Sequence, residues 1–302
     1  MVEPIEISDC LTAFKLMGVN SSFFEIDQNK LNFTIAGKGY PVLLLHGWPQ
    51  TSYMWRHLYP YLVKNNFCVI MPDVPGLGNS FYPISYDKKT IASYLQRLVH
   101  DHLNFDQIYI VGHDWGGPIA YSYARTSHDK VKKIVLIDVL VPGDGTSDFS
   151  SNRWHHQFHK INTFPEELIK GREKLYLKYF YENWSGKQFT MEKDAQNKYL
   201  KAYANEEIMK SGFEYYRALP QDIDDNIEFL KKGKLDTPFL GIAGKDGYGR
   251  GIEIILNSLK RITNNYEGYE ISSGGHWVAE EEPVLVAKYI FCLLYTSPSP
   301  RD

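Results

Sequence analysis

Residues 108–121, which read IYIVGHDWGGPIAY, constrain the fold of this chain more than any other stretch. The first four are β-branched or aromatic and predict a short strand that is buried on both faces. A turn at residues 112–116 follows, and apolar side chains at helical spacing from Gly117 onward predict a helix. A strand, a sharp turn and a helix with the pattern Gly-x-nucleophile-x-Gly are typical of an elbow that presents a nucleophile above a parallel sheet. Asp114 occupies the nucleophile position.

An aspartate at this position predicts a different reaction from a serine or a cysteine. A serine attacks a carbonyl and forms an acyl-enzyme, whereas a carboxylate displaces a leaving group from a saturated carbon and forms an alkyl ester. The helix that starts after Asp114 also favours an anion at its N-terminus. Because an ordinary strand-to-helix turn carries the same glycines, the assignment depends on other segments of the chain.

Composition limits the class of protein. A chain of 302 residues with 43% hydrophobic content buries a large core, and its length suits one domain with an insertion. The net charge of −3 and the lack of a basic stripe argue against nucleic acid or an anionic membrane as a partner. Residues 1–20 carry no basic segment followed by an apolar run, and no apolar stretch reaches the ~18 residues that span a bilayer. We therefore expect a cytoplasmic protein.

The cysteines and the C-terminal residues give two further expectations. Cys10, Cys68 and Cys292 show neither metal-binding spacing nor an even framework, which argues against a disulfide scaffold. Residues 292–302, CLLYTSPSPRD, back-translate without a mismatch into a widely used transposase sequencing adapter. We hypothesise that the reading frame ran past a truncated transcript at Phe291, and we exclude this non-native tail from the fold. A full-length transcript that encodes the same eleven residues would refute the hypothesis.

Apolar patterns before the elbow predict the first half of a sheet. Residues 21–36 show two alternating runs around residues 28–30 and predict an antiparallel hairpin. Residues 41–45 and 67–71 are continuous apolar runs, typical of strands covered on both faces. A helix is predicted between them at residues 50–62, with these side chains inward: Trp55, Leu58, Tyr59 and Leu62. Asp73, in the loop after the second strand, is expected to hold that loop by accepting hydrogen bonds.

The pattern changes after the elbow. A helix at residues 91–103 precedes the elbow strand, and a strand at residues 131–137 follows it and ends at Asp138. Helical segments rich in Tyr, Phe, Lys and Glu then replace the strand-like runs, at residues 166–184, 192–204 and 206–218, the last with Asn205 as its N-cap. We interpret residues 143–235 as a helical cap inserted between two strands of the sheet.

The sheet resumes after the cap. Residues 238–243 form a strand before a loop that carries Asp246, and residues 266–271 form the last strand, before a glycine-rich loop that carries His276. Strands that alternate with helices predict an α/β fold with a doubly wound, mostly parallel sheet, whose site lies at the carboxyl ends of the strands. The predicted core comprises residues 1–142 and 236–291.

Several separated segments together resemble the α/β-hydrolase family. These are the His46-Gly47-Trp48-Pro49 loop, the elbow, and the chain order of nucleophile, acid and histidine. The resemblance is to the branch that contains epoxide hydrolases, haloalkane dehalogenases and haloacetate dehalogenases. It implies that Asp114 is the nucleophile and His276 the general base, and that the backbone N–H groups of Trp48 and Trp115 form an oxyanion hole.

Two aspartates are candidates for the acid that orients His276. Asp138 ends the strand after the elbow and Asp246 follows the next strand, and both positions serve as the acid in this family. Asp246 comes two residues after Gly244, which departs from the usual spacing, so we favour Asp138. Its role would be to hold the tautomer of His276 and to stabilise the imidazolium.

Two cap segments resemble those that contact the leaving group in this family. In residues 153–158 and 213–218 the matching side chains are His155 and Tyr216, and we expect them to donate hydrogen bonds to an epoxide oxygen and to protonate the alkoxide. Their neighbours Trp154 and Tyr215 are expected to line the substrate pocket.

The cap histidines also invite a different interpretation, a metal site. The histidines concerned are His155, His156 and His159. No carboxylate or cysteine accompanies them, and we therefore expect neither a metal nor a cofactor.

The residues around the nucleophile favour one of the three chemistries. Haloacetate dehalogenases resemble this chain in the cap but bind the substrate carboxylate with arginines, where this chain has Trp115 and Pro118. Haloalkane dehalogenases bind the halide with the tryptophan after the nucleophile, which Trp115 matches, and with either an asparagine after His-Gly or a second tryptophan in the cap. This chain has Trp48 in place of that asparagine, and Trp154 is the candidate for the cap tryptophan. Epoxide hydrolases fit Trp48, Trp115, Tyr216 and the cap histidine together, and the one departure is a cap His–Tyr pair in place of their commoner Tyr–Tyr pair. We expect an enzyme that hydrolyses a small apolar epoxide, with a dehalogenase as the alternative.

A non-catalytic receptor with the same fold is a hypothesis of a different class. Such a receptor need not retain a nucleophile, an acid and a histidine together. The joint presence of Asp114, Asp138 and His276 therefore favours an enzyme.

Overall fold

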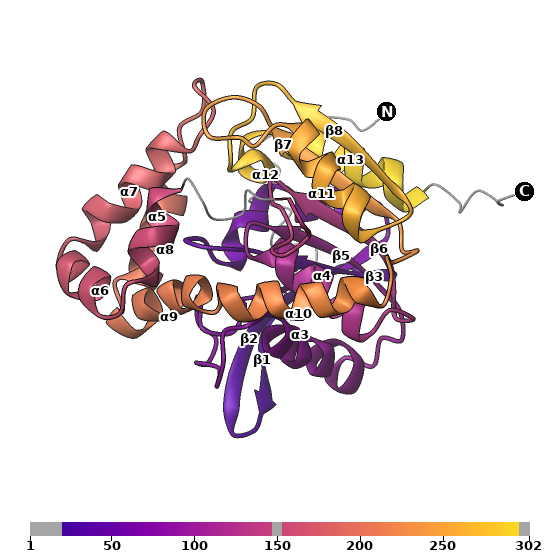
Figure 1. Cartoon of the computed structure of the whole chain (residues 1–302), viewed down its shortest axis with the longest axis horizontal. Helices are drawn as coiled ribbons and strands as arrows, with labels where there is room; N and C mark the ends of the chain where they lie inside the picture. The colour runs from indigo at the N-terminus through magenta and orange to yellow at the C-terminus, as the bar shows by residue number, and fades with distance from the viewer. Residues whose placement is uncertain (1–19, 147–152, 296–302) are drawn as a thin grey trace, which may run out of the picture.

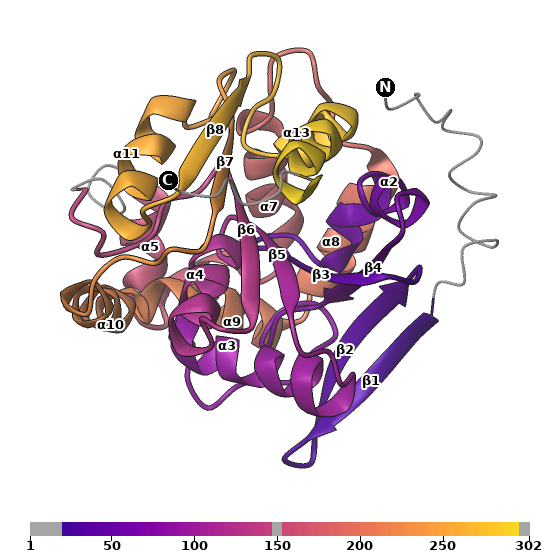
Figure 2. The same ribbon diagram turned by 90° about the vertical axis from the view of Figure 1, so that its right-hand side faces the viewer.

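The computed structural model describes residues 20–146 and 153–295. Within these ranges the chain forms one sheet in the order β1-β2-β4-β3-β5-β6-β7-β8 (Figure 2). The strands are β1 (Asn20–Ile26), β2 (Asn29–Ala36), β3 (Tyr40–Leu45), β4 (Phe67–Pro72), β5 (Ile108–His113), β6 (Val131–Ile137), β7 (Phe239–Gly244) and β8 (Tyr266–Ile271). β2 pairs antiparallel with β1 and β4, and every other pair is parallel. The predicted mostly parallel, doubly wound sheet is confirmed.

The N-terminal hairpin turns one residue earlier than its sequence pattern indicated. β1 and β2 are joined at Asp27 and Gln28, whose φ angles are 50° and 66°. Two consecutive positive φ angles are typical of the tight turn whose twist matches that of the flanking strands. β2 then pairs with β4, which attaches the hairpin to the parallel part of the sheet.

Helices cover both faces of the sheet (Figure 2). One face carries α2 (Tyr59–Lys64) and α13 (Pro283–Tyr295), and the other carries α3 (Lys88–Gln96), α4 (Gly116–Thr126) and α11 (Ile252–Ile262). The short helix α12 (Val278–Glu281) precedes α13. The central strands β3 and β4 are almost entirely buried between these layers, as expected for their continuous apolar runs.

Two predicted core helices are interrupted. The segment predicted at 50–62 divides into a 3₁₀ helix, η1 (Ser52–His57), and α2, with Pro60 in the first turn of α2. Proline suits the first turn of a new helix because it lacks the N–H that a continuous helix needs, so it favours a break there. The segment predicted at 91–103 is α3 followed by a π-helical turn, η2 (Arg97–His102). The predicted inward side chains of the first segment are all buried: Trp55, Leu58, Tyr59 and Leu62.

The proposed cap, residues 143–235, contains six helices in its described part. They are α5 (Trp154–Lys160), α6 (Phe164–Ile169), α7 (Glu173–Asn183), α8 (Lys193–Tyr203), α9 (Glu206–Arg217) and α10 (Leu219–Lys231). Helices α5 to α9 gather at one end of the molecule, and α10 runs back beside α3 (Figure 1). The single helix predicted at 166–184 is wrong, because Gly171 has a φ of +76° and separates α6 from α7. The predicted N-cap is confirmed, since Asn205 Oδ1 accepts from the backbone N–H groups of α9.

The C-terminal helix extends into the segment that we hypothesise to be non-native. Leu293 and Leu294 are buried, and their carbonyl groups accept hydrogen bonds from Lys133 Nζ at 2.7 and 3.0 Å. Residues 296–302 lie outside the described part of the chain. The origin of residues 292–302 stays a prediction. None of the helices in the described ranges is long and apolar enough to cross a membrane.

Candidate active site

The elbow places Asp114 between the end of β5 and the start of α4. Its backbone φ is +49°, a left-handed conformation that non-glycine residues rarely adopt. The turn is so tight that a Cβ on Gly116 would lie 2.1 Å from the backbone oxygen of Leu45. The side chain of Asp114 is 14% exposed, so a ligand can reach it.

The two carboxylate oxygens of Asp114 have different environments. Oδ1 accepts a hydrogen bond from the backbone N–H of Trp48 at 2.9 Å, and the backbone N–H of Trp115 also bonds to the carboxylate. Oδ2 lies 3.5 Å from Nε2 of His276. A Cβ on Gly47 would lie 2.3 Å from Oδ1, so the loop needs a glycine to approach the carboxylate this closely. The geometry holds one oxygen in place and leaves the other beside the histidine.

The charge of Asp114 is stabilised against burial. Burial raises the pKa of this carboxyl group, but the hydrogen bond and charge of His276, together with the Trp115 N–H, lower it well below its usual range. Asp114 is therefore a carboxylate at neutral pH, as a nucleophile must be.

The loop that carries Trp48 is held from both sides. Nε2 of His46 accepts a hydrogen bond from the Val74 N–H at 3.0 Å, which leaves Nδ1–H to donate to the Gly47 carbonyl at 3.0 Å. From the cap, the Tyr181 hydroxyl donates to the Pro49 carbonyl at 2.7 Å. These bonds fix the direction of the Trp48 N–H.

His276 lies between two aspartates. Its Nδ1–H donates to Oδ2 of Asp138 at 2.7 Å, and its Nε2 faces Asp114. Burial lowers the pKa of the imidazole, but the two carboxylates raise it above its ordinary value. The His276 backbone N–H donates to the carbonyl of Trp184 at 2.8 Å, which attaches the histidine loop to the cap.

The structure brings Asp138, and not Asp246, to His276. Oδ1 of Asp138 accepts hydrogen bonds from the backbone N–H groups of Arg250 at 2.9 Å and Gly244 at 3.3 Å, and the residue is fully buried. Asp246 instead pairs with Lys187: it accepts from the Lys187 backbone N–H at 2.7 Å, and its Oδ1 lies 3.1 Å from the Lys187 Nζ. The loop after β7 thus contributes backbone donors to Asp138 and no carboxylate to His276.

Tyr216 and the cap histidines face the elbow from α9 and α5. The Tyr216 ring packs edge-on against Trp115, with centroids 4.9 Å apart, and lies 5.8 Å from His155 and 5.0 Å from His156. Burial, with the charge of Asp114 as a second cause, raises the pKa of Tyr216 well above its ordinary value. This side chain is a neutral phenol in the buried site.

The cap histidines are neutral as well. Burial, followed by the neighbouring His156, lowers the pKa of His155 far below its ordinary value. Burial and then Arg250 lower the pKa of His156 to about 3. Each ring at neutral pH therefore carries one N–H donor and no charge.

Comparison with known proteins was consistent with this geometry. Residues 40–283 match the family described as alpha/beta hydrolase fold. The chain belongs to this family. A soluble epoxide hydrolase from Corynebacterium sp. (strain C12) is 33% identical over 275 residues, covering 86% of this chain and 92% of that protein. A haloalkane dehalogenase from Psychrobacter cryohalolentis is 24% identical over 271 residues, covering 85% and 84%.

Solved structures agree with the sequence relatives. The epoxide hydrolase CorEH, solved without ligand, aligns with a TM-score of 0.82 and 29% identity, over 91% of this chain and 99% of that one. The resemblance to the branch of epoxide hydrolases and dehalogenases is confirmed. The family match and these relatives place the chain among enzymes of the hydrolase class.

Two side chains that we expected to line the substrate pocket have other contacts as well, and that expectation stays a prediction. Trp154 is 48% exposed, and its ring stacks on Phe180 at 5.7 Å. The Tyr215 ring lies 6.3 Å from that of Trp115, and its hydroxyl donates to the Pro75 carbonyl at 2.7 Å, which attaches α9 to the loop after β4.

Three side chains at the site had no signal in the sequence analysis. Trp184 packs edge-on against His276 at 5.1 Å and also contacts His155 at 4.7 Å. His113 donates from Nε2 to the His276 carbonyl at 2.8 Å, and burial lowers its pKa to about 4. The side chain of Arg250 donates from Nε to the Asp138 carbonyl at 2.9 Å. His113 directly precedes Asp114 in the elbow, and this adjacency is the one sequence signal that could have found any of the three.

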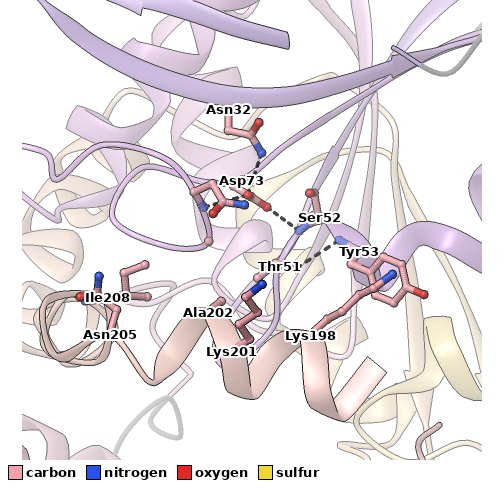
Figure 3. Close-up of a pocket in the computed structure, with 12 residues that line it drawn as sticks. Asn32, Thr51, Ser52, Tyr53, Asp73, Lys198, Lys201, Ala202, Asn205 and Ile208 are labelled. Atoms are coloured by element: carbon pink, nitrogen blue, oxygen red, sulfur yellow. Dashed lines mark hydrogen bonds between the residues drawn. The ribbon is translucent and has the colours of Figure 1, made fainter. Parts of the chain in front are cut away.

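A separate hollow of about 410 Å³ opens between the cap helix α8 and the core (Figure 3). Asp73 lies in it and accepts hydrogen bonds from the Asn32 side chain and from the backbone N–H groups of Ser52 and Asn79, each at 2.9 Å. The predicted loop-fixing role of Asp73 is confirmed. The residues that line this hollow do not include any candidate catalytic side chain. In residues 20–146 and 153–295, no group of three or more His, Cys, Asp or Glu side chains is arranged to hold a metal ion.

Proposed function

We propose that this hydrolase converts an apolar epoxide to a vicinal diol through a covalent ester on Asp114. The observation that carries the proposal is the pairing of a carboxylate on the elbow with neutral hydrogen-bond donors in the cap. Tyr216 lies against Trp115, whose backbone N–H holds Asp114, and His155 lies against Tyr216. The relative from Corynebacterium sp. (strain C12), which is named a soluble epoxide hydrolase, also supports an epoxide as the substrate.

In the first step, Oδ2 of Asp114 attacks a carbon of the epoxide ring. A new carbon–oxygen bond forms, the ring carbon–oxygen bond breaks, and its electron pair passes to the epoxide oxygen. Tyr216 donates its phenolic proton to that oxygen, and His155 donates a second hydrogen bond. The products of this step are the alkyl ester and a phenolate that the remaining donors stabilise.

In the second step, His276 removes a proton from water, and the resulting hydroxide attacks the ester carbon of Asp114. The negative charge of the tetrahedral intermediate develops on Oδ1, where the backbone N–H groups of Trp48 and Trp115 donate. Asp138 stabilises the imidazolium of His276. The intermediate then collapses, and the bond between the Asp114 carboxyl carbon and the substrate oxygen breaks. The proton of the added hydroxyl group passes to the departing alkoxide, so the diol leaves and Asp114 is a carboxylate again. The proton held by His276 restores the phenol of Tyr216.

The choice of an epoxide over a halide depends on the basicity of the leaving group. The oxygen of an opened epoxide is an alkoxide and needs a proton donor, whereas a halide ion is a weak base and needs only polarised N–H contacts. Tyr216 is a neutral phenol in the site, so it carries the proton that an alkoxide needs. The alternative is a dehalogenase that forms the same ester. Two observations favour it: Trp115 directly follows Asp114, and the relative from Psychrobacter cryohalolentis is named a haloalkane dehalogenase.

A comparison of three substrates tests the proposal. Styrene oxide, 1-bromohexane and fluoroacetate are assayed in parallel for diol, bromide and fluoride. We expect diol from styrene oxide to exceed the other two products. Halide release without diol would identify a dehalogenase, and no turnover of any of the three would favour a non-catalytic receptor.

Isotope labelling tests the covalent step separately. In one turnover in ¹⁸O-water with enzyme in excess, the added oxygen comes from Asp114, so the diol should carry little label. A fully labelled diol would show direct attack by water and would refute the ester.

A further inference from the structure

A lysine is buried behind the catalytic elbow. Lys88, the first residue of α3, and Asp222 of α10 each expose about 1% of their side chains, and Nζ of Lys88 lies 2.6 Å from Oδ2 of Asp222. Charged side chains are almost never this buried unless they are paired. Nζ also donates to the carbonyls of Tyr215 at 2.9 Å and Tyr86 at 3.3 Å, so each of its three N–H groups has an acceptor.

The same ammonium lies on the indole of Trp115. Nζ is 4.3 Å from the centroid of that ring, well within the range of a cation–π interaction. Trp115 has two further contacts with the site, because its backbone N–H bonds to Asp114 and its ring packs against Tyr216 at 4.9 Å. Trp115 thus contacts Lys88 on one side and both Asp114 and Tyr216, the proposed nucleophile and proton donor, on the other.

The ion pair also joins the core to the cap. Lys88 and Trp115 belong to the core, whereas Asp222 and Tyr215 belong to the proposed cap, and α10 lies beside α3 (Figure 1). Asp222 bonds to Lys88 twice, since its Oδ1 accepts from the Lys88 backbone N–H at 2.7 Å. The position of the ammonium on the indole is therefore set by groups that the cap supplies.

We propose that Lys88, held by Asp222, is a positioning residue that orients and polarises Trp115 for proton donation by Tyr216. The Trp115 side chain forms a hydrogen bond with the Tyr216 hydroxyl, and its only polar group is the indole N–H. A cation on the face of an indole attracts its π electrons, which makes this N–H a stronger donor toward the phenol and toward the phenolate that forms in the first step. The inference depends on the proposed function, because it concerns the step in which the epoxide oxygen is protonated.

A purely structural role is the competing explanation. A buried ion pair can often be replaced by apolar side chains of similar volume without loss of stability, whereas removing one partner alone leaves an unpaired buried charge. The decisive variant is therefore the double substitution Lys88→Met with Asp222→Leu. It removes both charges together and retains apolar packing between α3 and α10.

A neighbouring pair provides the matched control. Lys89 follows Lys88 in α3, and its Nζ lies 3.8 Å from Oδ1 of Asp225 in α10, but the two side chains are 52% and 18% exposed rather than buried. The double variant Lys89→Met with Asp225→Leu removes the same kinds of charge from the same two helices. We expect it to retain wild-type turnover.

The experiment measures the single-turnover rate of ester formation from styrene oxide at about pH 8, the apparent Kd from its concentration dependence, and the melting temperature of each variant. We expect Lys88→Met with Asp222→Leu to fold, to keep its apparent Kd, and to form the ester more slowly, on the order of tenfold or more. The same pair of substitutions in a Tyr216→Phe background should cost much less, because the two changes act on one step.

Four outcomes separate the possibilities. A wild-type rate of ester formation in the folded double variant would overturn the inference, as would an equal loss of that rate in the Tyr216→Phe background. If the double variant does not fold, Asp222→Asn is measured in the same cycle, and an additive loss with Tyr216→Phe overturns the inference. Absence of diol from the wild-type protein would instead refute the proposed function.

Discussion

Nδ1 of His276 donates a hydrogen bond to Oδ2 of Asp138 across 2.7 Å. This bond leaves Nε2 of the same ring as the atom that faces Asp114. In the mechanism that we propose, His276 takes a proton from water and needs its unprotonated nitrogen on that side, so the bond to Asp138 would select the tautomer that the proposed second step requires.

Replacing Asp138 should therefore impair turnover more than replacing Asp246. An asparagine at position 138 no longer stabilises the imidazolium and can present its amide to the ring, which favours the wrong tautomer. We expect Asp138→Asn to lower kcat by roughly 10²- to 10⁴-fold. Asp246→Asn is the control, because Asp246 pairs with Lys187 outside the site, and it should stay near wild type. A greater loss in Asp246→Asn would transfer the acid role to that residue.

Removing the base should trap the covalent intermediate. His276→Gln retains a polar side chain but cannot take a proton from water, so the ester on Asp114 should form and persist. Intact mass after incubation with styrene oxide should show the protein plus one epoxide, and peptide mapping should place the adduct on the elbow peptide. Unmodified protein that still turns over would remove His276 from the mechanism.

The pKa of His276 should depend on the charge of Asp114. The carboxylates of Asp114 and Asp138 raise this pKa above its ordinary value. The Asp114→Asn variant loses one of these charges, so its His276 should titrate at a lower pH than in the wild type. NMR titration of the ring protons, assigned against His276→Gln, measures both values, and an unchanged pKa would contradict the geometry.

The same shift has a consequence for stability. A histidine whose pKa is higher in the folded than in the unfolded protein contributes stability that is complete below its unfolded value of about 6.5. That contribution is lost as the pH rises through the folded pKa. We expect the free energy of unfolding to fall over this interval in the wild type and to fall less in Asp114→Asn, as measured by urea unfolding at a series of pH values.

The cap donors should act on the first step. Tyr216→Phe removes the phenolic proton without a large change in packing, and we expect epoxide opening to slow by about 10²- to 10⁴-fold. Turnover of 1-bromohexane, if measurable, should change less. Single-turnover formation of the ester is the appropriate readout, since hydrolysis does not use this proton.

The two adjacent histidines provide an internal comparison. We expect His155→Phe to slow ester formation more than His156→Phe, in line with the proposed role of His155. His156 is the closer ring to Tyr216, at 5.0 Å against 5.8 Å. A larger loss in His156→Phe would assign the second donor to His156.

The sequence by itself determined the order of the elements and the positions of Asp114 and His276. Both depend on local information, because the elbow needs glycines at fixed offsets and each strand or helix has its own hydrophobic period. For the same reason, most errors concern element boundaries. The break at Gly171 required a left-handed backbone conformation that the surrounding helical pattern concealed.

Only the tertiary structure decided which distant side chains meet. Spacing left Asp138 and Asp246 as alternatives, and the choice was made by packing, since residues 112 positions apart along the chain (Asp138 and Arg250) bond to each other. The same holds for the pairing of Lys88 with Asp222, which are 134 positions apart. A lysine at the start of a helix looks solvent-exposed in sequence, and it is buried here because the cap folds back over it and supplies the opposite charge.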